Sequence, residues 1–209
     1  TCLKQLQGLE LRNVQINLFI DGKKKDKEFG ELAFTAHGLS GATILTLSEQ
    51  VVLALDNEQQ VHITLDLKPA LDSKKLDARF LRDFDNRKGE PIASVLRGLL
   101  PKEYIPVCLQ DCSIPENIDT RNFPAKMRKK LIHWFKEQRF EISGYRSWNE
   151  AIITAGGISL KEINPTTMES KIIKGLYIVG EVLDLHADTG GFNLQAAFST
   201  GWLAASSIH

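Results

Sequence analysis

The sequence has little cysteine, no excess of charge and no long apolar run. Its three cysteines, Cys2, Cys108 and Cys112, and the absence of a charged-then-apolar leader argue against a secreted disulfide framework and favour a reducing cytoplasm. The 26 basic residues balance the 26 acidic ones, so no overall field attracts nucleic acid or an anionic membrane. No stretch reaches the ~18 consecutive apolar residues of a membrane helix. We therefore expect a soluble cytoplasmic protein whose partner is a small molecule or a protein, with no nucleic acid and no membrane partner.

Two further features are assigned no function. Cys108 and Cys112 are spaced to share one helical face, but no second cysteine or histidine cluster with zinc-ligand spacing accompanies them, so we interpret them as ordinary thiols and expect no metal site. The basic runs 23–25 and 128–130 lack interleaved aromatic residues that would stack on bases, and we interpret them as solvated surface.

The pattern of apolar residues divides the chain into regions. With 209 residues, one core and a smaller satellite are expected. Strand-like alternation runs through 9–67, where Asp21-Gly22 fits a hairpin turn and only 43–55 favours a helix. Helical spacing follows around 76–84 and 92–100, and again within 124–138, where Pro124 suits a first turn. The segment 140–153 is expected to return as a strand beside the first region.

The third region, from about residue 140, carries the chemistry. An apolar run, 151–158, is predicted to be a strand ending in two glycines, and 175–181 a short buried strand that presents a glycine and then a carboxylate. A glycine turn then opens a buried helix over 194–208. Each piece alone is more often a plain turn or a surface charge. Together they supply a hydroxyl acceptor, a close backbone approach and a positive helix end, all of which a flavin nucleotide needs.

The motifs of this region resemble a known family. The runs are EAIITAGGI (150–158), EINPTTMESK (162–171), GLYIVGEVLD (175–184) and TGGFNLQ (189–195), with GELAFT (30–35) and GLSG (38–41) upstream. They are similar to those of the bacterial NAD(P)/FAD-dependent oxidoreductase flavoproteins of the aminoacetone oxidase-like type. The similarity spans most of the chain. One departure is that the family's N-terminal Gly-x-Gly-x-x-Gly turn, which holds the pyrophosphate, occurs nowhere in it.

The resemblance implies an α+β fold: a small β-barrel plus a helical subdomain, followed by the C-terminal segment of a discontinuous α/β FAD-binding domain. The expected parts are a barrel over 1–70, a helical subdomain over 71–138, strands crossing back over 139–158 and an FAD-binding segment over 159–209. Because the nucleotide turn is missing, we expect a C-terminal fragment of an FAD-dependent oxidoreductase that is inactive alone. The alternative is a barrel-and-helix binding module without catalytic activity.

The resemblance also implies a set of cofactor contacts. The expected FAD-binding residues are Gly156, Gly157, Gly180, Glu181, Thr189, Gly190, Gly191, Phe192 and Asn193. NAD(P)H is a possible electron donor, and neither the substrate nor a catalytic residue is assigned. We interpret His186 and Asp188 as solvent-facing loop residues rather than a general acid–base pair, and Asp184 as either a ribityl contact or a local cap.

Overall fold

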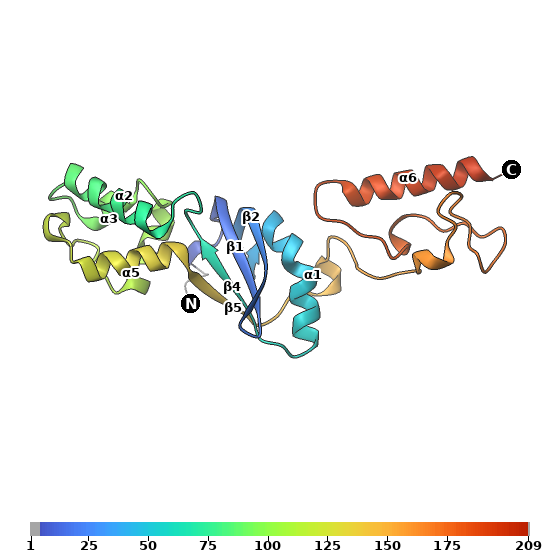
Figure 1. Ribbon diagram of the computed structural model, residues 1–209, viewed down its shortest axis with the longest axis horizontal. Helices are drawn as coiled ribbons and strands as arrows, with labels where there is room; N and C mark the ends of the chain where they lie inside the picture. Colours follow the sequence, from blue (N-terminus) through green and yellow to red (C-terminus); the bar gives the residue numbers. More distant parts are fainter. Residues whose placement is uncertain (1–4, 209) are drawn as a thin grey trace. The chain divides into compact units, whose positions relative to one another are not determined.

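The computed structural model describes residues 5–208 and divides into two compact units (Figure 1). The N-terminal unit is Thr1–Ser143 and the C-terminal unit is Gly144–His209.

A curled five-stranded sheet forms the centre of the N-terminal unit (Figure 1). Its strands are β1 (Glu10–Ile20), β2 (Lys23–Thr35), β3 (Gly38–Ser40), β4 (Val61–Asp66) and β5 (Gln138–Ile142), in the spatial order β3-β2-β1-β4-β5. All neighbours pair antiparallel. Alternate residues of β1 are buried, as the period of two predicted. The hairpin at Asp21-Gly22 is confirmed, with φ of 49° and 72°, the left-handed pair that matches strand twist in a two-residue loop.

Helix α1 packs against this sheet. The structure confirms the helix expected within 43–55, as α1 (Ala42–Asp56), which contacts β2 and β3. It begins after Gly41, whose φ is 102° and whose Cβ position would lie 2.9 Å from the carbonyl oxygen of Glu31. The hydroxyl of Thr43 donates to that same carbonyl at 2.7 Å. Glycine is therefore required where the strand and the helix start meet.

The helical part of the N-terminal unit contains α2 (Ser73–Asn86), α3 (Ile92–Leu96), α4 (Ile105–Cys112) and α5 (Ala125–Lys136). The barrel-plus-helical fold class is confirmed. Helix α4 was not predicted. The helix expected within 124–138 is confirmed as α5, although Pro124 is the residue before its first turn rather than part of it. Burial raises the pKa of Cys108 in α4, so this residue stays an uncharged thiol of the core.

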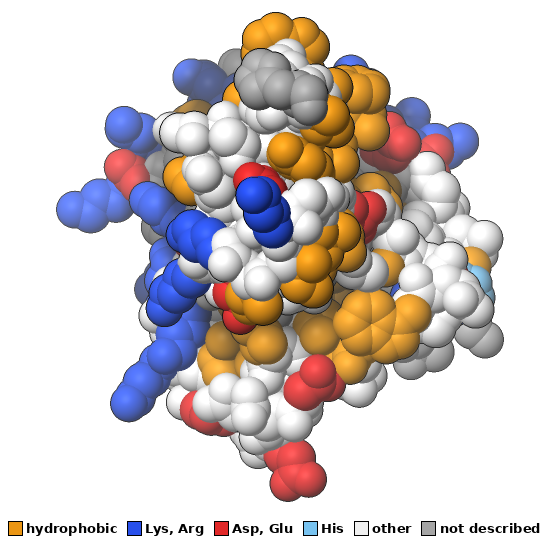
Figure 2. Space-filling view, turned by 90° about the vertical axis from the view of Figure 1, so that its right-hand side faces the viewer, with side chains coloured by type: hydrophobic (Ala, Val, Ile, Leu, Met, Phe, Trp, Pro, Cys, Tyr) orange, Lys and Arg blue, Asp and Glu red, His pale blue; other side chains and the backbone are white. Residues whose placement is uncertain are grey.

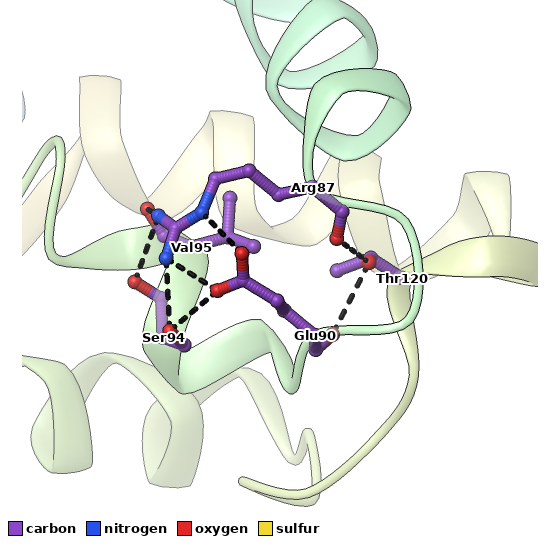
Figure 3. A network of polar contacts seen from close by, with 5 residues as sticks. All are labelled: Arg87, Glu90, Ser94, Val95 and Thr120. Carbon is purple, nitrogen blue, oxygen red and sulfur yellow. Dashed lines mark hydrogen bonds and ion pairs between the residues drawn. The ribbon is translucent and has the colours of Figure 1, made fainter.

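The turn from α2 to α3 is held by a polar network (Figure 3). The Arg87 guanidinium donates to both carboxylate oxygens of Glu90, at 3.0 and 2.5 Å, and to Oγ of Ser94 at 2.9 Å. The Thr120 hydroxyl donates to the carbonyl oxygens of Arg87 and Glu90, at 3.0 and 3.1 Å. The Arg87 hydrogen bonds lower the pKa of Glu90. Because these groups satisfy one another, we interpret the network as a structural clasp.

The C-terminal unit has little regular structure apart from α6 (Phe192–Ser207). It also contains single 3-10 turns at Trp148–Glu150, Leu160–Glu162 and Gly180–Val182. Among residues 5–208, no helix has the length and apolar character needed to cross a membrane. No group of three or more His, Cys, Asp or Glu side chains within the same range is arranged to hold a metal ion.

Three strand predictions for the region after residue 138 were wrong. Strand β5 ends at Ile142, so the strand expected over 140–153 stops early. The run 151–158 is irregular and pairs only through a parallel bridge between Ile158 and Leu183. The run 175–181 has one antiparallel bridge, at Tyr177, and then a 3-10 turn. Short apolar runs need neighbouring strands to become sheet, and these find only single bridges among the described residues.

Candidate functional site

Glu181 is held from outside its own segment. Its Oε1 atom accepts hydrogen bonds from the backbone N–H of Thr154 at 2.9 Å and from the Thr154 hydroxyl at 3.1 Å. Both residues are exposed. Glu181 therefore has one oxygen engaged by the chain, and no hydrogen bond from the described residues reaches Oε2. An ionised carboxylate accepts about four hydrogen bonds, so this side chain retains acceptor capacity at the surface.

The two neighbouring glycines at 156 and 157 differ in what surrounds them. The Cβ position of Gly157 would lie 2.5 Å from the carbonyl oxygen of Val182, so the close backbone approach here is to the chain itself. Ile158 pairs on either side of Leu183, its N–H donating to Val182 and its carbonyl accepting from Asp184. Gly156, with φ 94°, has nothing within 4 Å of its Cβ position. Gly157 is thus required by packing, while Gly156 leaves open space beside the backbone.

Gly180 is tied to the middle of α6. Its φ is 73°, and its N–H donates to the hydroxyl oxygen of Thr200 at 3.0 Å. The Thr200 hydroxyl donates in turn to carbonyl oxygens one helical turn earlier, at Ala196 and Ala197. Helix α6 therefore fixes the position from which Glu181 projects.

The N-terminus of α6 carries the glycine turn. Gly191, at φ 89°, is the residue before the helix, and no side chain of the described residues caps it. The first N–H groups of a helix have no partners inside the helix and carry partial positive charge. The Cβ position of Gly191 has nothing within 4 Å, whereas that of Gly190 would lie 3.2 Å from the Phe192 ring. The helix start is thus open to an anionic or carbonyl group.

Asn193 closes the loop that precedes this helix. Its Oδ1 accepts from the N–H of Ala187 at 2.8 Å, and its Nδ2 donates to the Ala187 carbonyl at 2.7 Å. Thr189 is exposed within the closed loop, as are His186 and Asp188. The side chain of Asn193 therefore shapes the glycine turn from behind.

The anchor of Gly180 and the start of α6 are separated along the helix. Thr200, which anchors Gly180, lies nine residues after Gly191 on α6. At a rise of about 1.5 Å per residue, the two points are roughly 13 Å apart along the helix. The Gly180 anchor and the helix start are therefore separate points on α6. An extended ligand that carries hydroxyl groups and a charged or carbonyl group offers partners for both Glu181 and the helix start.

An apolar cavity of about 260 Å³ also lies in the C-terminal unit. It is lined by Leu160, Ile163, Pro165, Met168, Leu183, Leu185, Ser199, Thr200 and Leu203. None of the expected FAD-binding residues is among them. Figure 2, viewed from the side of this unit, shows several patches of apolar side chains on this face.

Sequence reasoning missed two residues of this site, Thr154 and Thr200. Thr154 stands inside the run before Gly156, but its contact with Glu181 joins residues 27 positions apart. Thr200 lies within the predicted helix and gave no separate signal. These two threonines hold Glu181 and Gly180, whereas Asn193 at the start of α6 closes the loop that contains Thr189, Gly190 and Gly191.

Comparison with known proteins identifies the family. A family model described as the HI0933-like protein barrel and H2TH domain matches residues 1–153. The chain belongs to the HI0933-like family. The expected resemblance is confirmed at this level, as a family related to flavoprotein oxidoreductases and to rRNA dihydrouridine synthases, whereas the aminoacetone oxidase-like assignment stays a prediction.

Three curated relatives cover most of the chain. It is 29% identical over 178 residues to the 3-dehydro-bile acid delta(4,6)-reductase of Clostridium scindens, which covers 85% of the chain and 44% of that protein. It is 27% identical over 180 residues to the ribosomal RNA dihydrouridine synthase of Haemophilus influenzae, covering 86% and 42%. The corresponding Escherichia coli synthase is 28% identical over 178 residues, covering 85% and 42%. The chain therefore spans less than half the length of these relatives.

Proposed function

We propose that this HI0933-like chain supplies the inserted barrel-and-helix domain and the flavin-facing C-terminal segment of an FAD-dependent oxidoreductase. The observation that carries the proposal is the position of two features along α6: its uncapped N-terminus, and the Gly180 anchor at Thr200, about 13 Å further along the helix and next in sequence to Glu181. FAD is extended, with ribityl hydroxyl groups between an anionic pyrophosphate and a carbonyl-bearing ring. A carboxylate acceptor and an uncapped helix start fit different parts of such a ligand.

The proposed cofactor contacts are those expected from the sequence, with two refinements. Gly180, Glu181 and the turn at Gly190-Gly191 would face FAD, together with Gly156, Thr189 and Phe192. Gly157 and Asn193 already have close partners inside the chain. We propose that these two act by shaping the segments that carry the contacts.

FAD supplies hydride chemistry when bound. The contribution of this chain is electrostatic: partial positive charge at the α6 N-terminus favours a group that becomes more negative on reduction, by about 0.3–1 kcal/mol at an exposed helix end. The reductase name of the Clostridium scindens relative supports a reaction in which the substrate is reduced. We propose NAD(P)H as the electron donor and leave the substrate unassigned, because these relatives act on chemically different molecules by name.

The surface of the C-terminal unit supports the proposal that the chain is part of a larger protein. Of the seventeen exposed large apolar side chains among residues 5–208, fourteen belong to this unit, which holds fewer than a third of the residues. Leu194, Phe198 and Trp202 form a stripe at helical spacing on α6 and are 64–72% exposed. Its buried cluster is small, with only Ile163, Met168, Leu183 and Ala204 fully inside. Such a balance is typical of a surface that another part of the protein covers.

The test is to compare the whole protein, including any sequence that precedes this chain, with the chain alone. We expect the whole protein to purify with flavin absorbance, to take up FAD after stripping and to show flavin bleaching on addition of NADH or NADPH. The chain alone should be colourless and inactive. A whole protein that binds no FAD in this titration would refute the oxidoreductase proposal and favour the barrel-and-helix binding module.

A pair of variants separates Glu181 from its surroundings. Glu181→Gln in the whole protein should weaken FAD binding, whereas Glu162→Gln, also an exposed glutamate in a 3-10 turn of the same unit, should not. Equal FAD affinities for the two variants would remove Glu181 from the proposed site.

A further inference from the structure

We propose that Thr154 is a positioning residue that fixes the Glu181 carboxylate so that its Oε2 atom meets a cofactor hydroxyl. The inference rests on the proposed function, because it takes Glu181 as a ligand of FAD. Thr154 itself need not touch the cofactor.

The contact between Thr154 and Glu181 restricts the orientation of the carboxylate. The N–H and the hydroxyl of Thr154 converge on the same oxygen, Oε1 of Glu181, at 2.9 and 3.1 Å. Two donors on one oxygen restrict rotation of the carboxylate about its terminal bond, which is otherwise broad. An exposed glutamate normally samples several rotamers and must lose that freedom when it binds a ligand. Thr154 imposes this restriction before the cofactor arrives.

Thr154 and Glu181 both lie in segments that are anchored to other parts of the unit. Thr154 precedes Gly157 and Ile158, which pack against and pair with 182–184, immediately after Glu181. Gly180, immediately before Glu181, is held by Thr200 of α6. The carboxylate thus extends from a short segment that is held on both sides, and Thr154 restricts the remaining rotation of the carboxylate.

The positioned carboxylate keeps one oxygen as an acceptor for a ligand. With Oε1 engaged by Thr154, the acceptor that remains without a hydrogen bond from the described residues is Oε2. An oriented carboxylate oxygen forms charge-assisted hydrogen bonds with O–H donors. A polyhydroxylated chain such as the ribityl or ribose portion of FAD carries such donors.

The test uses apoprotein of the whole protein and FAD titration, with the melting temperature of each apoprotein measured in parallel. Thr154→Val removes the hydroxyl donor and keeps the size and branching of the side chain. Thr166→Val is a matched control, because the N–H and hydroxyl of Thr166 also converge on one side-chain oxygen, Oδ1 of Asn164, at 3.0 and 2.8 Å. Thr154→Ser restores the donor, and Thr154→Ala is a second variant without it.

We expect Thr154→Val and Thr154→Ala to weaken FAD binding by about fivefold to tenfold, the size of one hydrogen bond. Thr154→Ser should stay within about twofold of the unmodified protein, and Thr166→Val should bind FAD normally. The double variant Thr154→Val/Glu181→Ala should bind no more weakly than Glu181→Ala alone, because Thr154 acts through the side chain that alanine removes.

Several outcomes would overturn the inference. If Thr154→Val bound FAD normally while Glu181→Gln bound it weakly, Thr154 would have no positioning role and the proposed function would stand. If Thr154→Val and Thr166→Val lost the same affinity and the same melting temperature, the effect would be general destabilisation. If the two changes at 154 and 181 were additive, Thr154 would act independently of Glu181. A whole protein that took up no FAD would overturn the proposed function as well.

Discussion

The junction between α5 and the sheet depends on one buried ion pair, which Lys136→Met would break. The Nζ atom of Lys136 lies 2.6 Å from Oδ2 of Asp66 and donates to the carbonyl oxygens of Lys68 and Leu71 at 3.1 and 2.6 Å. These three partners match the three protons of the ammonium group. The two charged side chains are only 16% and 10% exposed, so the pair is largely shielded from water.

The expected loss follows from the charge that remains. Methionine keeps an unbranched stem of similar length, but it leaves the Asp66 carboxylate buried without a counter-charge. Removing one partner of a buried pair costs about 3–5 kcal/mol, and the residual exposure of both side chains places our expectation near 3 kcal/mol. Urea unfolding followed by tryptophan fluorescence measures this as a lower midpoint with an unchanged slope.

Two variants serve as controls for this prediction. Lys129→Met changes an exposed lysine of the same helix and should cost less than about 0.5 kcal/mol. Asp66→Asn combined with Lys136→Met should be more stable than Lys136→Met alone, because the neutral amide needs no counter-charge. If Lys136→Met matched Lys129→Met in unfolding free energy, the ion pair would not stabilise the junction as argued.

Three further predictions concern the cofactor site and the sheet. Glu181→Ala in the whole protein should weaken FAD affinity by roughly one to two orders of magnitude, because each charge-assisted hydrogen bond contributes about 1.5–3 kcal/mol. Saturating FAD should then restore most of the turnover. If FAD affinity stayed normal while the rate of flavin reduction collapsed, Glu181 would take part in the chemistry instead. Gly191→Val should lower flavin content, because φ of 89° disfavours a β-branched residue; full occupancy at an unchanged melting temperature would show that the turn does not touch FAD. Burial, and then the charge of Arg139, lower the pKa of His62, which stacks on Phe19, so the folded state prefers neutral histidine. Stability from this site should be complete above about pH 6.5 and decrease as pH falls towards the lowered pKa; His62→Phe should flatten unfolding free energy against pH in this range, and an unchanged slope would contradict the assignment.

The N-terminal unit was predictable from sequence because its elements are long and strongly periodic. Alternation in β1 and the helical spacing of Leu76, Phe80 and Phe84 follow directly from one-sided burial. Helix α4 was missed because it is only eight residues long, contains Pro106 and is buried through most of its length, which removes the amphipathic pattern.

The C-terminal unit was harder to predict, for the opposite reason. Its apolar runs are short and bounded by glycines, so local pattern favoured strands, but strands form only where neighbours provide hydrogen bonds. The runs around Ile158 and Tyr177 find single bridges within the described residues. Candidate contact residues could be identified from motifs and family resemblance. The contact between Thr154 and Glu181 could not, because nothing in the spacing of two residues 27 positions apart indicates a hydrogen bond.

The first part of β2 is a free edge of the sheet. Strand β3 pairs with β2 only at Ala33–Thr35, so on that side the stretch from Lys23 onward has no neighbouring strand among residues 5–208. Free edge strands can pair with the strands of other molecules, and charged side chains on the edge, especially lysine, oppose such pairing. The three lysines at 23–25, and Lys27 after them, lie on this free edge. We therefore expect its positive charge to disfavour strand pairing between copies of the protein.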